Sequence, residues 1–130
     1  MIYIVDDDQS VRANLARLMR SAGFSARTFA SAEEFLASSH TIEVGCLLLD
    51  ITLPGLSGLQ LQAELNKRGV GLPVIALSAR DDSETSDMAR QLGARCFFRK
   101  PVDDQALIDA IQWVSPPVSN KAAAAGKAER

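Results

Sequence analysis

Three aspartates, one serine and one lysine are the side chains of this chain that are best placed to act together in chemistry. Each follows a short apolar run, and they are Asp6, Asp7, Asp50, Ser78 and Lys100. Carboxylates that converge on one point repel one another strongly unless a cation lies among them. A hard, oxygen-seeking ion such as Mg²⁺ suits such a site, because it binds a few carboxylates and a backbone carbonyl and retains several waters.

These residue types meet the needs of phosphoryl transfer to an aspartate. A carboxylate beside Mg²⁺ can attack a phosphoryl group and form an aspartyl phosphate. A lysine can bind one phosphoryl oxygen, and a hydroxyl can donate to another. We therefore predict Asp50 as the acceptor, Lys100 as the cationic clamp and Ser78 as the hydroxyl donor. The predicted ligands of Mg²⁺, for which Mn²⁺ can substitute, are Asp6, Asp7, Asp50 and the backbone carbonyl of Thr52.

Five short apolar runs separate these side chains, and each has the length of a strand. The runs cover residues 2–5, 26–29, 46–49, 74–77 and 95–98. Amphipathic helical patterns lie between them, and such alternation predicts a parallel sheet covered on both faces. The nearly continuous apolar character of the middle runs is typical of strands buried on both faces. We predict an α/β fold, a doubly wound five-stranded parallel sheet in the order 2-1-3-4-5 flanked by five helices.

This sheet would bring residues that are distant in sequence into one site. Right-handed crossovers place the carboxyl ends of all its strands at one edge. Ligands bind at that edge where the strand order reverses, which for this order lies between the first and third strands. Asp6 and Asp7 follow the first strand and Asp50 follows the third, so the three carboxylates are expected to meet there.

The predicted helices carry signals at their ends. Asp8 is expected to cap the first helix, which should end near Gly23. Ser31 and Glu34 form a predicted capping box, and Asp103 can cap the last helix. The apolar face of that last helix is expected to bury Leu107, Ile108 and Ile111.

The C-terminal third of the chain has three further features. The pattern over residues 83–92 is the weakest helix because its first half is polar, and we expect it to be mobile or to serve as a contact surface. Trp113 is expected to be a packing residue. Two prolines and an alanine-rich stretch follow Ser115. We therefore predict one domain at residues 1–114 and a linker or C-terminal tail at residues 115–130.

The composition of the 130 residues excludes several classes of protein. A net charge of -2 and a pI near 5.3 argue against direct nucleic-acid binding by this segment. The apolar runs are far shorter than the roughly 18 residues that a membrane span needs. Met1 is not followed by an export signal, and Cys46 and Cys96 lack metal-type spacing. We therefore expect a cytoplasmic domain with two small buried thiols.

Each candidate side chain also has a plainer interpretation. Asp6 and Asp7 could be helix caps, and Asp50 could open a turn. Ser78 could cap the following helix, and Lys100 could be a solvated residue at the edge of the sheet. One helix cannot use three aspartates as caps, however, and the coincidence of all these residues at strand ends favours a shared site.

Three other classes of protein share parts of the pattern. Aspartate-nucleophile phosphatases of the haloacid-dehalogenase type carry a second aspartate two residues on, where this chain has Thr52, and they usually need a cap that is missing from so short a chain. A flavin-binding module would want a phosphate-binding loop after the first strand, but that loop is triply acidic. The Gly-x-x-x-x-Gly-Lys-Ser/Thr motif of nucleotide triphosphate sites is absent.

The constellation as a whole resembles the receiver domain of two-component response regulators, which has a CheY-like, flavodoxin-like fold. The resemblance covers residues 1–114. The matching segments are Val5-Asp6-Asp7, residues 49–58 (LDITLPGLSG), Ser78-Ala79 and Lys100-Pro101. It implies that Asp50 accepts a phosphoryl group from a sensor histidine kinase. It also implies a signalling module rather than an enzyme, whose only reactions are Mg²⁺-dependent self-phosphorylation and slow autodephosphorylation.

The same resemblance implies a switch. In the family, residues at the positions of Ser78 and Phe97 rearrange on phosphorylation, and the peptide bond before a proline such as Pro101 is often cis. Phe97 stands where tyrosine is common, so burial rather than a hydroxyl hydrogen bond must drive its movement. Thr52 and Arg80 occupy positions that the family uses to tune the lifetime of the phosphate.

Residues 20–24, 30–36 and 45–58 look like the FixJ type of regulator, whose C-terminal half is a helix-turn-helix domain. By this resemblance the chain is the regulatory half of a DNA-binding transcriptional regulator; the alternative is a stand-alone receiver that signals by docking. Phosphorylation is expected to change the face formed by helix 83–92, strand 95–98 and the last helix. That face is then expected to control homodimerisation or the output domain.

Overall fold

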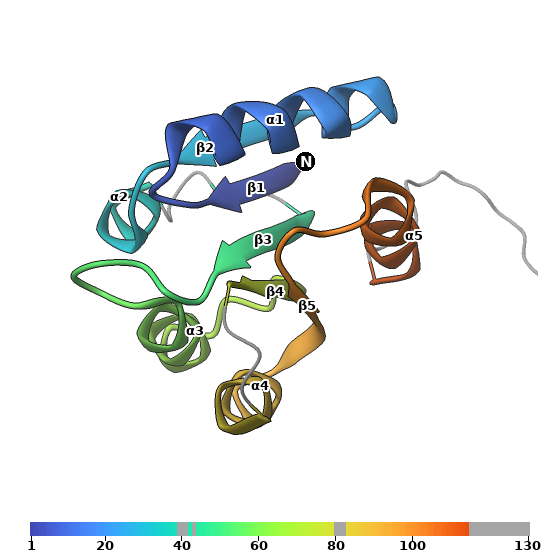
Figure 1. The fold of residues 1–130 in the computed structure, drawn as a ribbon. Coiled ribbons are helices and arrows are strands. Elements are labelled where there is room, and N and C mark those ends of the chain that lie inside the picture. Colours follow the sequence, from blue (N-terminus) through green and yellow to red (C-terminus); the bar gives the residue numbers. More distant parts are fainter. Residues whose placement is uncertain (39–41, 43, 80–82, 115–130) are drawn as a thin grey trace, which may run out of the picture.

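The computed structural model describes residues 1–38, 42, 44–79 and 83–114, and Figure 1 shows them as a ribbon. Strands and helices alternate throughout this part of the chain. The elements are β1 (Ile2–Val5), α1 (Gln9–Ser21), β2 (Ala26–Phe29), α2 (Ala32–Ala37), β3 (Cys46–Asp50), α3 (Gly58–Lys67), β4 (Val74–Ser78), α4 (Ser83–Gln91), β5 (Ala94–Arg99) and α5 (Asp104–Val114). The predicted linker or tail at residues 115–130 and the predicted lifetime-tuning residue Arg80 lie outside the described residues.

The strands form one sheet in the order β2-β1-β3-β4-β5, with every neighbouring pair parallel. This confirms the predicted fold. Helices α1 and α5 pack on one face of the sheet, and α2, α3 and α4 pack on the other (Figure 1). The helices cover both faces, so the edge where the strands end is left to carry the site.

The core consists of two layers, because successive residues of a strand point to opposite faces of the sheet. On β1, Tyr3 and Val5 pack toward α2, α3 and α4, whereas Ile2 and Ile4 pack toward α1 and α5. The Tyr3 ring meets the Phe35 ring edge-on, with 5.9 Å between the ring centroids. This burial on both faces explains why the strands read as continuous apolar runs.

β3 and β4 each extend one residue beyond the end of their apolar runs. β3 includes Asp50, which pairs with Leu77, and β4 includes Ser78, which pairs with Arg99. The backbone ladder continues through these positions although their side chains are polar. Two of the candidate site residues therefore occupy the last position of a strand rather than the following loop, which fixes their backbones firmly.

The helix caps agree with the sequence in part. The Asp8 carboxylate accepts from the backbone N–H groups of Ser10 and Val11, and Asp103 accepts from Ala106 N–H at 2.9 Å. Ser31 accepts from Glu34 N–H, but the Glu34 carboxylate accepts from Ala30 N–H instead of returning to Ser31. The predicted capping box is therefore only half formed. A complete capping box, not predicted, joins Ser57 and Gln60 at the start of α3.

The last helix buries a narrower stripe than predicted. Leu107 and Ile111 are buried as expected, whereas Ile108 is half-buried against them. Trp113 was predicted to be a packing residue, and this is wrong, because 79% of its surface is exposed. The buried stripe continues from Ile111 to Val114, and Trp113 lies about 100° around the helix from Val114. Trp113 shares its exposed side of the helix with Asp109.

The two cysteines are free thiols, of which Cys46 is buried and Cys96 is half-buried. The prediction of buried thiols is therefore right for the first and only partly right for the second. Burial raises the pKa of the Cys46 thiol to about 12, so that thiol stays protonated and unreactive at neutral pH. In the described part of the chain, no helix has the length and apolar character that a membrane crossing requires.

Candidate functional site

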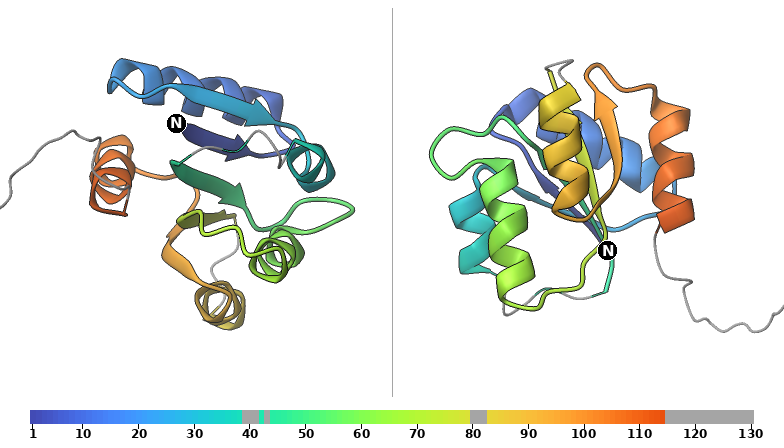
Figure 2. Two further views of the ribbon diagram at one scale, coloured as in Figure 1. Left: turned by 180° about the vertical axis from the view of Figure 1, so that it is seen from behind. Right: turned by 90° about the horizontal axis from the view of Figure 1, so that it is seen from below.

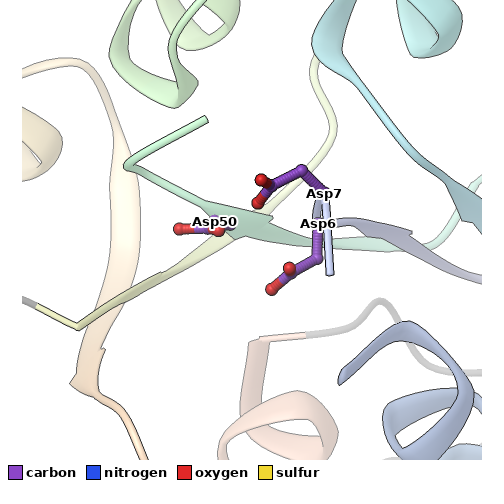
Figure 3. Close-up of side chains that lie close together, drawn as sticks. All are labelled: Asp6, Asp7 and Asp50. Carbon is purple, nitrogen blue, oxygen red and sulfur yellow. The ribbon is translucent and has the colours of Figure 1, made fainter. Parts of the chain in front are cut away.

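Three carboxylates meet at the adjacent ends of β1 and β3. Asp6 and Asp7 directly follow β1, and Asp50 is the last residue of β3. One carboxylate oxygen from each lies within 4.8 Å of one from each of the others. Figure 3 shows the three side chains gathered at this point. Asp6 and Asp50 are buried, whereas Asp7 is exposed, so one side of the cluster is open to solvent.

Lys100 reaches this cluster from the segment that follows β5. Its ammonium Nζ donates to Asp6 Oδ2 at 2.7 Å and lies 3.4 Å from Asp50 Oδ2. Its backbone N–H donates to the carbonyl of Ser78 at 2.7 Å, which ties the lysine to the end of β4. The peptide bond from Lys100 to Pro101 is cis, as the resemblance implies. The cationic side chain therefore lies between two of the predicted metal ligands.

Asp6 and Asp50 hold their two oxygens in the same way. Oδ1 of Asp6 accepts from the backbone N–H of Asp8 at 2.9 Å. Oδ1 of Asp50 accepts from both the backbone N–H and the hydroxyl of Thr52, at 3.0 and 3.1 Å. In both residues Oδ2 is the oxygen that faces Lys100. Each carboxylate is thus oriented by one oxygen and presents the other to the centre of the site.

Burial and the charges of the site act on two pKa values. Burial raises the pKa of the Asp6 carboxyl, and the hydrogen bond from Lys100 only partly opposes this effect. Burial also lowers the pKa of Lys100, but the hydrogen bond to Asp6 and the charge of Asp50 outweigh it, so that pKa is raised overall. The two groups differ in their charged neighbours, because the charge of Asp50 favours the ammonium of Lys100 but disfavours the carboxylate of Asp6.

Two contacts around the site were not predicted from the sequence. The Arg12 guanidinium, on α1, donates to the backbone carbonyl of Asp6 at 2.7 Å. Gly58 starts α3 so close to β3 that a Cβ atom would lie 2.5 Å from the carbonyl oxygen of Asp50. The only sequence signal for the second contact is a glycine at the first position of a helix, where its conformational freedom alone gives no advantage.

The predicted switch residues lie on β4, on β5 and in the segment that follows β5. Ser78 is fully buried at the end of β4, next to the β3 strand that carries Asp50. Phe97, in the middle of β5, is half-buried and packs against the core layer under α2, α3 and α4. Pro101 follows Lys100 directly. The fold therefore brings the predicted site residues that it describes to one edge of the sheet, except Phe97, which lies within β5.

The donor set fits a hard divalent cation. All the side-chain ligands that the cluster offers are carboxylate oxygens, which Mg²⁺ prefers. With the aspartates ionised, three negative charges face the one positive charge of Lys100. A divalent ion would balance the two charges that remain, and the exposed Asp7 leaves it a path from solvent.

Comparison with known proteins agrees with the fold and the site. Residues 2–112 match the family model of the response regulator receiver domain. The chain belongs to this family, whose members are signalling modules of two-component systems rather than a family of catalytic enzymes.

Its relatives include transcriptional regulators. The chain is 42% identical over 110 residues to the transcriptional regulatory protein TdiR of Thauera aromatica, covering 85% of this chain and 48% of TdiR. It is 39% identical over 111 residues to the transcriptional regulatory protein FixJ of Azorhizobium caulinodans, covering 85% of this chain and 53% of FixJ. The crystal structure of FixJ-N superposes with a TM-score of 0.81 at 33% identity, covering 85% of this chain and 89% of that one.

The chain thus spans about half the length of the curated relatives it matches. It is a receiver domain of a two-component response regulator, as found in FixJ-like regulators.

Proposed function

We propose that this domain accepts a phosphoryl group on Asp50 from a sensor histidine kinase and transmits the change through the face formed by α4, β5 and α5. The observation that carries the proposal is the convergence of two buried carboxylates and one ammonium, with Asp50 Oδ2 only 3.4 Å from Lys100 Nζ. This geometry suits a nucleophile, because one oxygen of the Asp50 carboxylate is held by Thr52 and the other lies near the Lys100 ammonium.

The roles of the side chains follow from their contacts. Thr52 holds Oδ1 of Asp50, so Oδ2 is the oxygen free to attack phosphorus. The new bond from Oδ2 to phosphorus forms as the bond from phosphorus to the kinase histidine breaks, and the histidine nitrogen keeps the electron pair. Lys100 then binds a phosphoryl oxygen, and the Ser78 hydroxyl donates to another.

The carboxylates of Asp6, Asp7 and Asp50, with the backbone carbonyl of Thr52, would hold Mg²⁺ or Mn²⁺ at this site. When bound, the ion supplies positive charge that offsets the charge on the phosphoryl oxygens. Lys100 already donates to Asp6 Oδ2. An ion bound by these carboxylates would weaken the attraction of Asp6 for Lys100 and leave the ammonium available to the phosphoryl group.

A groove beside Lys100 offers the kinase a place to dock. It lies between α1 and the start of α5, has a volume of about 400 Å³, and is lined largely by apolar side chains such as Leu15, Val102 and Leu107. Lys100 and Pro101 form part of its wall. A partner helix in this groove would place its histidine next to the site that receives the phosphoryl group.

We expect phosphorylation to act by shifting the equilibrium between two states of the α4-β5-α5 face. Phosphorylation adds about 1.5 to 2 negative charges and new acceptor oxygens next to Lys100 and Ser78. When Ser78 moves toward them, Phe97 turns inward from its half-buried position, and the α4-β5-α5 face changes shape. Both states must pre-exist within a few kcal/mol, since a ligand shifts only what it binds differentially. The changed face then forms a homodimer.

The complete regulator is a cytoplasmic protein in which a C-terminal DNA-binding domain is the output. The support is the chain's similarity to FixJ and TdiR, which are both described as transcriptional regulatory proteins and of which the match covers only about half. The receiver itself does not contact DNA in this proposal, because its pI is near 5.3.

Beryllium fluoride, which mimics a phosphoryl group on a carboxylate, tests the acceptor and the dimer together. With Mg²⁺ present, wild type should show a bound ¹⁹F resonance and sediment as a dimer, and Asp50→Asn should do neither. Glu64→Gln on α3, outside the proposed dimer face, is the matched control, because its amide oxygen can still accept from Arg68. A bound resonance in Asp50→Asn would refute Asp50 as the acceptor, and binding without dimerisation would refute the dimer.

A further inference from the structure

The C-terminal end of α4 is held by two amide side chains from the neighbouring helix α3. Figure 2 shows α3 beside α4 on the same face of the sheet. Gln62 Nε2 donates to the carbonyl of Ala89 at 3.1 Å, and Asn66 Nδ2 donates to the carbonyl of Leu92 at 2.9 Å. The two donors are one helical turn apart, so they reach two successive points at the end of α4.

These carbonyls are ones that a helix end cannot satisfy by itself. The last four carbonyls of a helix lack intrahelical partners unless the chain turns back on them. At the end of α4 the backbone N–H groups of Leu92 and Gly93 serve the carbonyls of Met88 and Arg90. The carbonyls of Ala89 and Leu92 are served by α3 instead. The two amides therefore act as a C-terminal cap that is supplied by a different helix.

The stability of the folded domain does not explain why residue 62 is a glutamine. Its side chain is 1% exposed, and among the described residues its Oε1 atom has no hydrogen-bond partner. A buried, unpaired acceptor costs free energy that a leucine of similar size at this position would avoid. Its neighbours on the buried face of α3, Leu61 and Leu65, are leucines already. What the amide adds is its bond to the carbonyl of Ala89.

Packing alone holds this end of α4 weakly. A cavity of about 170 Å³ lies beside the two amides, lined also by Leu92, Gly93 and the segment that precedes β4. Ala89 is the only buried residue that α4 contributes. Close packing is therefore incomplete where the two hydrogen bonds are made, and the bonds fix the position of the helix end.

The opposite end of α4 follows the phosphoryl site closely in the sequence. Ser78 ends β4 and Ser83 begins α4, so only four residues separate the two elements. Residues 83–88 are all exposed or half-buried, so this half of the helix has little packing to resist a displacement. α4 is thus held by hydrogen bonds at its C-terminal end and only lightly packed at its N-terminal end.

We propose that Gln62 and Asn66 form the fixed pivot of α4, about which its N-terminal end swings when the domain is phosphorylated; the swing, though not the pivot, rests on the proposed function. A helix of nine residues is about 13 Å long, so a rotation of about 10° moves the free end by about 2 Å. The two amides are positioning residues. They convert a local movement at Ser78 into a directed rotation of the output helix.

Hydrogen–deuterium exchange with mass spectrometry tests the pivot. The Gln62→Leu/Asn66→Ala variant should exchange the amides at the end of α4 about tenfold faster than wild type, since two hydrogen bonds are lost. The urea midpoint of unfolding of the double variant should stay within error of wild type. The midpoint of Gln62→Leu alone should equal or exceed that of wild type. Lys67→Ala, which removes an exposed side chain next to Asn66, is the control and should change neither quantity.

The second arm uses beryllium fluoride and Mg²⁺ as the probe of the swing. In wild type, the probe should alter exchange in residues 83–87 and leave residues 88–92 unchanged; in the double variant both halves should respond. Wild-type exchange at the end of α4 in the double variant, or equal responses of both halves in wild type, would overturn the pivot. If beryllium fluoride does not bind wild type, the proposed function fails. The exchange measurement without the probe still tests whether Gln62 and Asn66 form the pivot.

Discussion

Asp6 and Asp50 show how a single residue type sets both the geometry and the charge of the site. Each uses Oδ1 to accept from a backbone N–H two residues later, and each turns Oδ2 toward Lys100. This local turn is a habit of aspartate and needs no help from the rest of the fold. The convergence of the two Oδ2 atoms on one ammonium, by contrast, needs β1, β3 and β5 to end at the same edge of the sheet.

Lys100 should compete with the metal ion in the free protein. Lys100→Met removes a positive charge that lies 2.7 Å from one predicted ligand and 3.4 Å from another. Mg²⁺ should therefore bind the variant several-fold more tightly, as isothermal titration calorimetry can measure. Phosphorylation by acetyl phosphate should nevertheless slow by about a hundredfold, because the clamp on the phosphoryl oxygen is lost. Weaker Mg²⁺ binding than in Lys67→Met, the exposed control, would contradict this account.

Asp6 should make stability depend on pH in an unusual direction. Its folded-state pKa is raised above the ordinary value of 3.8, so the folded state holds the proton more tightly than the unfolded state. Its contribution to the unfolding free energy must then fall as pH rises from 3.8 through the raised pKa, and stay constant above it.

Asp6→Asn removes this titration, so the variant should gain stability relative to wild type over that same pH range. Urea unfolding of both proteins at a series of pH values in a metal-free buffer measures the difference. A difference that is flat, or that favours wild type increasingly as pH rises, would show that the Lys100 pair controls the titration of Asp6 instead. Asp109→Asn, at the surface of α5, should give no such trend.

At the scale of elements, the junction between β3 and α3 sets the position of Asp50. A Cβ atom on Gly58 would lie 2.5 Å from the carbonyl oxygen of Asp50 and 2.7 Å from the Cα atom of Ile51. Both are backbone atoms, so neither can move without shifting the strand that carries the acceptor. The glycine therefore permits the close approach of a helix and a strand end, and its backbone conformation is not the reason for its presence.

Gly58→Ala should destabilise the domain by about 1–3 kcal/mol in urea unfolding, the usual cost of overpacking. The same variant should accept phosphate more slowly, because the shift displaces Asp50. Gly71→Ala is the matched control, since no atom lies within 4 Å of its Cβ position, and it should be neutral or slightly stabilising. Equal stability of the two variants would show that α3 can move away from β3 without cost.

The sequence predicted the elements well and their ends less well. Apolar runs locate the strands because both faces of a central parallel strand are buried, but they stop at Asp50 and Ser78, where the backbone ladder continues under polar side chains. Trp113 was misplaced because an aromatic residue near an apolar stripe does not reveal on which side of the stripe it falls. Arg12 and Gln62 were missed because their partners are backbone carbonyls, which leave no mark on a sequence.

At the scale of the molecule, the site and the output surface are joined by β5. Arg99 at the end of β5 pairs with Ser78 of β4, and Lys100 follows directly. Phe97 lies in the middle of the same strand. One strand thus touches the phosphoryl site and the face that is proposed to dimerise. Of the exposed large apolar side chains, Met88 lies on α4 and Trp113 on α5, on the two helices that flank this strand.

Phe97→Ala should leave phosphorylation intact and weaken dimerisation. The side chain is half-buried on β5, which β4 separates from the strand that carries Asp50, so phosphorylation of Asp50 should continue at close to the wild-type rate. The dimer formed with beryllium fluoride should weaken by about tenfold or more, because the inward state loses the aromatic burial that stabilises it. Sedimentation velocity over a range of concentrations measures the dimer. Unchanged dimerisation would remove Phe97 from the switch.

The measurement that bears most directly on the central claim is the intact mass after incubation with acetyl phosphate, with and without Mg²⁺. We predict that wild type gains one phosphoryl group only when Mg²⁺ is present and that Asp50→Asn gains none. A gain in Asp50→Asn would place the acceptor elsewhere, and a gain by wild type without Mg²⁺ would contradict the role assigned to the acidic cluster. No gain in wild type under either condition would contradict the account of this domain as a phosphoacceptor.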